Sequence, residues 1–144
     1  MGNSQSMKKI NYEDMQTVVK NPEIYMLINT LPVDSQDCLI STTVSVEKEE
    51  AIINKYLKEN RSIKIIIYGK HCNDDLVDKK YQQLLALGFY DVYAYMGGLF
   101  EWLLLHDIYG KDLFPVNNTN TNKKNIDILR FKPHPMLNIS LLEY

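Results

Sequence analysis

Residues 63–102 read IKIIIYGKHCNDDLVDKKYQQLLALGFYDVYAYMGGLFEW, and this segment determines most of the predicted architecture. Its beginning, residues 63–68, contains four consecutive large apolar residues after Lys64, without alternation, which is typical of a strand buried on both faces. A helix is predicted next, because Asp74 or Asp75 can cap it, apolar residues recur on one side of it, and Gly88 suits its end. The segment therefore predicts a buried strand, a polar loop and an amphipathic helix.

A second strand and a second helix follow in the same order. Residues 92–95 are apolar and of strand length, Gly97-Gly98 forms a turn, and residues 99–109 form a helix that is apolar on most sides. Strands alternating with helices predict an α/β fold with a small parallel sheet flanked by helices on both faces. Ligands of such sheets bind at the carboxyl ends of the strands, so residues 69–75 are the expected site.

The sequence before this segment continues the alternation of helix and strand. A helix is expected over residues 11–19, with Asn11 as its N-cap, and a second helix over residues 45–59. Apolar runs predict short strands at residues 25–28 and 38–40. We therefore expect one domain over residues 10–115.

The segments on both sides of this domain differ from it in composition. Residues 1–9 are a polar tail, and residues 116–125 are a low-complexity linker made mostly of Asn, Thr and Lys. Residues 126–144 regain apolar residues but contain two prolines, which disfavours a long helix. This C-terminal segment is expected on the domain surface, and a peptide that binds a partner is the alternative.

The composition excludes several classes of function. A net charge of −2 gives no bulk attraction for nucleic acid, and only two arginines are present to build a phosphate site. The two cysteines, Cys38 and Cys72, form no disulfide framework and have no partners at metal-ligand spacing, so no metal or cofactor is expected. Without a secretory signal, a reducing compartment is the default, and we expect a cytoplasmic protein. No run reaches the roughly 18 apolar residues of a transmembrane helix.

The amino terminus fits the pattern for N-myristoylation, with Gly2 and with Ser6 at the required distance. A polar flexible tail without a lipid is the alternative. One acyl chain binds a membrane only marginally, and Lys8-Lys9 adds little positive charge. The motif therefore predicts reversible membrane contact at most.

Residues 65–102 also resemble the second half of a rhodanese domain. The resemblance rests on Ile65-Ile66-Ile67-Tyr68, on Leu87-Gly88-Phe89 at the end of the helix, on Val92-Tyr93, and on Gly97-Gly98 with Trp102 four residues after the second glycine. It extends over residues 10–115. Membership of this family implies a parallel α/β sheet, an active-site loop after the strand, and sulfur transfer through a cysteine persulfide.

Three departures separate this sequence from an active rhodanese. Asn29 and Leu31 stand where the family usually has Asp and Arg, and Cys38-Leu39-Ile40-Ser41-Thr42 replaces a Gly-His-Ile-Pro-Gly-Ala stretch. The family places its cysteine directly after the strand, but here that residue is Gly69. The only cysteine of the loop, Cys72, comes three residues later.

The resemblance implies Cys72 as the catalytic nucleophile. Backbone N–H groups around the sulfur at the start of a helix would lower its pKa, and nearby carboxylates would oppose this effect. The alternative is an ordinary loop thiol, because most free cysteines are inert. The predicted substrate-binding loop consists of Gly69, Lys70, His71, Asn73, Asp74 and Asp75.

Two functions remain open from the sequence. One is a sulfurtransferase that takes sulfur from a small donor and passes it to a protein thiol or another acceptor. The other is a catalytically inactive rhodanese-like module that binds an unknown protein partner, tethered to a membrane through Gly2. Phosphatase activity is not expected, because Asp78 stands where a Cys-x5-Arg phosphatase has its arginine.

Overall fold

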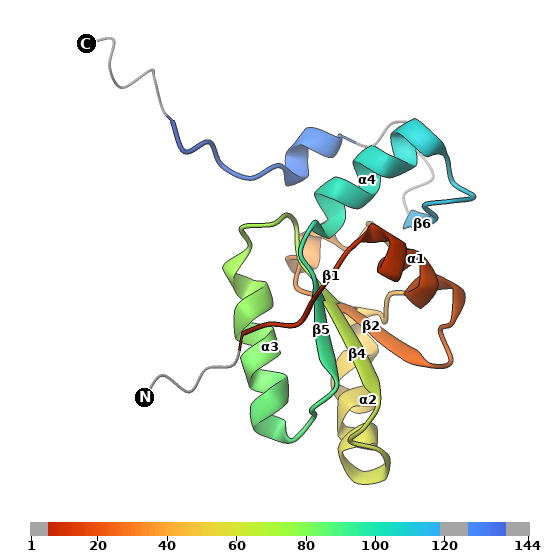
Figure 1. The fold of residues 1–144 in the computed structure, drawn as a ribbon, viewed down its shortest axis with the longest axis vertical. Helices are drawn as coiled ribbons and strands as arrows, with labels where there is room; N and C mark the ends of the chain where they lie inside the picture. Colours follow the sequence, from red (N-terminus) through yellow and green to blue (C-terminus); the bar gives the residue numbers. More distant parts are fainter. Residues whose placement is uncertain (1–5, 119–126, 138–144) are drawn as a thin grey trace.

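A parallel sheet of four strands runs through the part of the chain that the computed structural model describes, residues 6–118 and 127–137 (Figure 1). The strand order is β1-β5-β4-β2, with bounds Lys9–Ile10, Val92–Tyr95, Lys64–Tyr68 and Tyr25–Asn29. The register sets Tyr68 of β4 beside Asn29 of β2 and Tyr95 of β5, so the carboxyl ends of these strands meet. The predicted α/β fold with a small parallel sheet is confirmed.

A separate ribbon of two antiparallel strands joins β3 (Cys38–Ile40) to β6 (Val116–Asn118). The sequence predicts a strand at residues 38–40, but this strand does not enter the parallel sheet. The segment predicted as a linker, residues 116–125, begins with β6, and its remainder lies outside the described residues. The two-residue strand β1 was not predicted at all.

Four α-helices cover the sheet within the described residues: α1 (Tyr12–Lys20), α2 (Val46–Glu59), α3 (Asp75–Leu87) and α4 (Gly98–Tyr109). A capping box begins α1, because Asn11 Oδ1 accepts the N–H of Asp14 at 3.0 Å and Asp14 Oδ2 accepts the N–H of Asn11 at 3.2 Å. Asp74 caps α3, and Gly88 ends it in the left-handed conformation, as predicted.

The core divides into two clusters, one on each face of the sheet. Ile66 and Tyr68 of β4 face α1 and α4, whose Met15 and Trp102 are fully buried. Ile65 and Ile67 belong to the other cluster, with residues of α2 and α3. Because successive residues of a strand point to opposite faces, both faces of β4 need apolar residues. This explains the run without alternation in its sequence.

The C-terminal part of the described chain packs on this domain. A short 3₁₀ helix, η2 (Ile128–Phe131), contacts α4, and Phe131 is only 1% exposed within the first cluster. Arg130 Nη2 lies 3.3 Å from Asp37 Oδ1. Residues 127–137 of the predicted tail therefore begin with a segment that is anchored in the core.

No helix in residues 6–118 or 127–137 is long and apolar enough to cross a membrane.

Candidate functional site

The loop after β4 lies at the carboxyl edge of the sheet, and the start of α4 holds it in place. The carbonyl oxygen of Gly69 accepts the N–H of Leu99 at 2.9 Å, and that of Lys70 accepts the N–H of Phe100 at 2.8 Å. Gly98 has a φ of 68°, and a Cβ there would lie 2.8 Å from the oxygen of Gly69. The Gly-Gly turn is therefore required for the loop to approach α4 so closely.

The carboxylate of Asp74 occupies the centre of this loop. Its Oδ1 accepts the N–H of Leu76 at 3.0 Å, as an N-cap does, and its Oδ2 accepts the N–H of Lys70 at 3.0 Å. The hydroxyl of Thr30, at the end of β2, lies 3.4 Å from the same Oδ2. The loop thus gathers donors around an anion, and that anion belongs to the chain itself.

Gly69 shows which space the carboxylate fills. A Cβ built on Gly69 would overlap Asp74 Oδ2 and would lie 2.7 Å from Cγ2 of Val77. Any side chain at position 69 would therefore point at the carboxylate. This is the position at which the family resemblance places a catalytic cysteine.

Cys72, the predicted nucleophile, lies on the outside of the loop. Its side chain is exposed, and no atom of the described residues forms a hydrogen bond to its sulfur. The next amide, that of Asn73, donates to Nδ1 of His71 at 3.1 Å. Cys72 therefore does not share the donors that surround Asp74.

The predicted loop residues are only partly brought together. Gly69, Lys70 and Asp74 meet in the centre, whereas His71 and Asn73 bond to each other at the rim. Asp75 is exposed as the first residue of α3. Gly2, the predicted lipidation site, lies outside the described residues.

Two residues of the site were missed from the sequence, Thr30 and Gly98. Both were readable in principle, since Thr30 directly follows a predicted strand whose carboxyl end faces the same edge, and Gly98 belongs to the predicted turn. The sequence does not reveal the path of the loop. That path brings Thr30 close to Asp74 and Gly98 close to Gly69.

The two residues that depart from the family pattern at and just after the end of β2 have structural roles. Asn29 is buried, its Oδ1 accepts the N–H of Leu31 at 2.9 Å, and its amide group bonds to the side chain of Gln36. Leu31 is 6% exposed and belongs to the first core cluster. An apolar contact thus stands where the family usually places a charged arginine.

A cavity of about 320 Å³ opens beside the loop, between the first turns of α2 and α3. Thr30, Val46 and Leu76 are among the residues that line it, and Lys80 Nζ pairs with Glu49 Oε2 at 2.6 Å in its wall. At the carboxyl edge of the sheet, a cavity lined by both acidic and basic side chains therefore lies next to the loop that the Asp74 carboxylate occupies.

The second cysteine is a core residue. Cys38 is 4% exposed, and burial, reinforced by the charge of Asp37 and opposed by Arg130, raises the pKa of its thiol to about 11. A thiol of this kind is protonated at neutral pH and inert.

Comparison with known proteins gives no match to a family model and none to a curated protein. Among solved structures, the rhodanese-like domain of an Anabaena sp. protein is 15% identical, with 92% of this chain and 93% of that chain covered and a TM-score of 0.59. The single-domain sulfurtransferase of Saccharomyces cerevisiae is 17% identical, with 78% and 99% covered and a TM-score of 0.50. The thiosulfate sulfurtransferase of Pseudomonas aeruginosa is 19% identical, with 68% and 19% covered and a TM-score of 0.54.

The chain therefore has a rhodanese-like fold, as its strand and Gly-Gly motifs predicted. Sulfurtransferases are among the proteins that share this fold. A fold does not fix an activity, which depends on the residues of the site.

Proposed function

We propose that this rhodanese-like domain is a catalytically inactive binding module. One observation carries the proposal: the carboxylate of Asp74 fills the space in which a side chain at position 69 would lie. The N–H groups of Lys70 and Leu76 already bond to this carboxylate, so they are not free for a sulfur anion. The anion that the loop accommodates is therefore the chain's own Asp74 carboxylate.

Electrostatics supports the same conclusion. A persulfide anion near Gly69 would approach a carboxylate, and like charges at close range disfavour each other's ionised form. In a partly buried loop this repulsion is stronger than in water. A loop that stabilises Asp74 is therefore poorly suited to hold a second anion at the same place.

A second candidate function is sulfur transfer through Cys72, and two observations favour it. The thiol is exposed, and the N–H groups of His71 and Cys72 form no hydrogen bond to the described residues. In this reaction the thiolate of Cys72 attacks the outer sulfur of thiosulfate, a new S–S bond forms, and sulfite leaves with the electron pair of the broken bond. The persulfide then passes its outer sulfur to an acceptor thiolate.

Intact-mass measurement separates the two candidates. The full chain is incubated with thiosulfate beside a Cys72→Ser variant, and both are measured without reductant. The binding-module proposal predicts no adduct in either protein. A gain of one sulfur atom in the wild type, absent from Cys72→Ser, would replace it with the sulfurtransferase candidate. Buried Cys38 serves as the internal control, because it stays unmodified in both cases.

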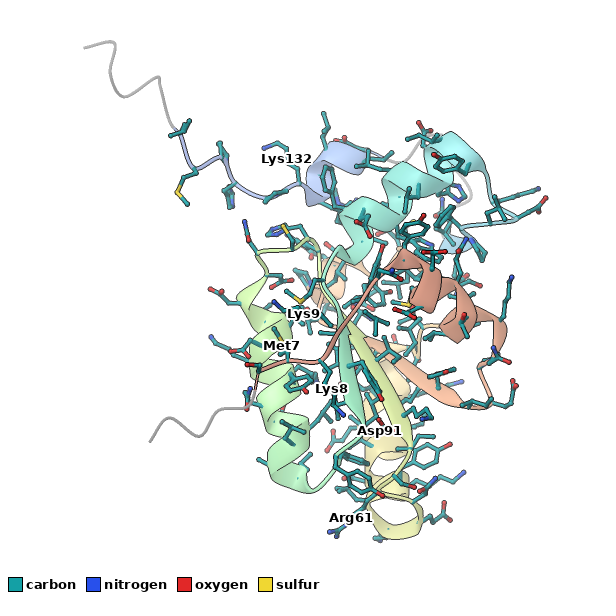
Figure 2. All side chains as sticks on the ribbon, in the orientation of Figure 1. Met7, Lys8, Lys9, Arg61, Asp91 and Lys132 are labelled. Atoms are coloured by element: carbon teal, nitrogen blue, oxygen red, sulfur yellow. The ribbon has the colours of Figure 1, made fainter. Side chains whose placement is uncertain are left out.

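We also propose that Gly2 carries a myristoyl group that makes membrane contact reversible, with the protein otherwise in the cytoplasm. The sequence pattern supports this, and Lys8 and Lys9 follow on the same N-terminal segment (Figure 2). Co-expression with an N-myristoyltransferase is expected to add one acyl group to the wild type and none to Gly2→Ala. Equal masses of the two proteins, after allowance for the substitution, would contradict the proposal.

A further inference from the structure

Charge is distributed unevenly between the two ends of the parallel strands. Each of α1, α2 and α3 leads into a strand, so its last turn lies near the amino end of that strand and its first turn lies toward the carboxyl ends. Each first turn contains two carboxylates, whereas the last turns of α1 and α2 contain Lys20 and Lys58. The helix dipole favours this distribution. The fold therefore collects acidic residues at the carboxyl end of the sheet.

The carboxyl end keeps its negative excess when its basic residues are included. Asp34 and Asp74, in the loops after β2 and β4, add to the carboxylates of the first turns. The basic residues of this end are fewer: Lys48, Lys70, Lys79, Lys80, and Arg130, which pairs with Asp37. The cytoplasmic leaflet of a membrane is negatively charged. Contact between this end and such a leaflet is therefore unfavourable.

The amino end of the sheet has no such excess of acid. Its basic residues are Lys8, Lys20, Lys58, Arg61 and Lys64, and its acidic residues are Glu23, Glu59 and Asp91. Asp91 serves both Lys8 and Lys64, at 3.9 Å and 3.2 Å, and Asp14 of α1 lines a cavity beside Lys64. Arg61 is exposed and forms no ion pair within residues 6–118 and 127–137. Figure 2 shows Lys8, Asp91 and Arg61 at this end. A negatively charged surface can approach here without repulsion.

Three large apolar side chains are exposed at the same end. Ile24 precedes β2 and is 44% exposed, Leu87 ends α3 and is 42% exposed, and Tyr90 precedes β5 and is 63% exposed. Apolar and aromatic side chains beside basic ones are suited to the head-group region of a membrane. α4 exposes apolar residues as well, but Figure 1 shows it at the end of the molecule opposite the connection between α2 and β4.

The position of the proposed lipid distinguishes between these two apolar surfaces. Gly2 precedes Ser6 by four residues, so its Cα can lie at most about 14 Å from that of Ser6. Residues 6–8 lead into β1, and Lys8 Nζ lies 3.4 Å from the carbonyl oxygen of Tyr90. An acyl chain on Gly2 is therefore tethered on the side of the molecule where Tyr90 is exposed.

We infer that the acylated chain lies on a phospholipid membrane with the amino end of its sheet against the head groups. Arg61 and Tyr90 then contact the lipid, and the loop of Asp74 and Cys72 faces away from it. The inference rests on the myristoylation of Gly2 proposed above. It adds an orientation that the sequence motif does not contain, and it leaves the carboxyl edge of the sheet open to a partner in solution.

The test measures which positions lie near the lipid. The full chain is co-expressed with an N-myristoyltransferase, and its intact mass is checked first. A fluorescent maleimide is attached to Cys72 of the wild type, or to Ser62→Cys or Leu129→Cys in a Cys72→Ser background; all three positions are exposed, and Cys38 is buried. Vesicles of phosphatidylcholine and phosphatidylserine carry a nitroxide quencher on their head groups. Thermal unfolding verifies that every variant is folded.

We expect strong quenching of the label at position 62 and little at positions 72 and 129. Arg61→Gln should lower the partition onto these vesicles about fivefold, the usual effect of one basic residue at an anionic surface. Lys132→Gln, at the opposite end (Figure 2), is the matched control and should not change it.

The outcomes separate this inference from the lipidation proposal. Absence of the acyl mass would contradict the proposal for Gly2, and the inference with it. An acylated chain whose label at position 72 or 129 is quenched as strongly as that at position 62 overturns the inference alone. Equal partition of Arg61→Gln and Lys132→Gln would overturn its electrostatic part.

Discussion

The carboxylate of Asp74 joins three parts of the chain that are distant in sequence. It caps α3, holds the loop through the N–H of Lys70, and reaches the end of β2 through Thr30. Hydrogen bonds to a charged acceptor are worth about 1.5–3 kcal/mol, more than bonds between neutral groups. Asp74 is therefore a structural residue that occupies the N–H groups of Lys70 and Leu76.

Replacing Asp74 tests this role. Asp74→Ala removes the acceptor of two backbone N–H groups, and we expect it to lower the free energy of unfolding by about 2 kcal/mol, above the ~1 kcal/mol of an ordinary N-cap. Asp74→Asn keeps an oxygen for the cap and should lose about half as much. Urea unfolding gives both values. A loss below about 0.5 kcal/mol in Asp74→Ala would mean that these bonds do not hold the loop.

Gly97 and Gly98, the N-cap and the first residue of α4, differ in what surrounds them. The three atoms nearest to a Cβ on Gly97 would all belong to the side chain of Glu101, and the backbone of Gly97 is ordinary, with φ −62°. A Cβ on Gly98 would meet backbone atoms of Gly69, Lys70 and His71, and its φ is positive. Backbone cannot yield as a side chain does, so the two positions should respond differently to the same substitution.

Gly98→Ala is therefore expected to lower the free energy of unfolding by about 3 kcal/mol, from strain in φ and from overpacking together. Gly97→Ala, its matched control, should cost about 1 kcal/mol. Urea titration of both variants measures the difference. If the two lose the same amount, the close approach of the loop to α4 is not what requires glycine at position 98.

Residue by residue, the sequence predicted the loop and its cap but not their arrangement. Asp74 is recognisable as an N-cap, because a carboxylate precedes an apolar helix. That its second oxygen turns back to Lys70 depends on the path of the loop, which the order of residues 69–75 does not determine. The same holds for Cys72: its place in the loop follows from the sequence, whereas its outward direction does not.

Among the secondary-structure elements, β4 was predicted most directly and β6 not at all. Four successive apolar residues reflect burial on both faces of β4, so its own sequence carries the signal. Residues Val116–Asn118 include two asparagines, which are depleted in strands, and they form β6 because β3 offers a pairing edge. Structure that depends on a distant partner leaves little trace in the local sequence.

The short helix η2 makes a similar long-range contact, and the contribution of this contact to the free energy of unfolding can be measured. Phe131 is almost fully buried against α4, so Phe131→Ala should cost about 3–5 kcal/mol of unfolding free energy. Leu129, in the same helix, is 62% exposed, and Leu129→Ala should cost less than about 0.5 kcal/mol. Guanidinium unfolding compares the two. Similar small losses would show that residues 127–137 do not contribute to the folded domain.

Taken as a unit, the domain has two ends with different character. At the carboxyl ends of the strands, the loop is filled by Asp74 and is clamped to α4. At the amino ends, a half-covered sheet face leaves a cavity beside Lys64.

Buried ionisable groups make the free energy of unfolding of the domain vary with pH in the alkaline range. Burial raises the pKa of Cys38 from 9.0 to about 11, and burial also raises the pKa of Tyr68 and of Tyr95, in the last case with the carboxylate of Glu101 adding to the effect. All three groups are neutral when protonated. The folded state therefore retains their protons at pH values where the unfolded state releases them.

Stability should consequently fall as the pH rises. The contribution of Cys38 is fully present below pH 9 and is lost progressively as the pH rises through its folded pKa of about 11, and the difference corresponds to about 2–3 kcal/mol. Urea unfolding under reducing conditions from pH 8 to pH 11 measures this loss. Cys38→Ala is the control, because it lacks the thiol and should show a shallower decline over the same range. Parallel declines in the two proteins would assign the alkaline sensitivity to the tyrosines, since the burial of Cys38 would then contribute nothing to it.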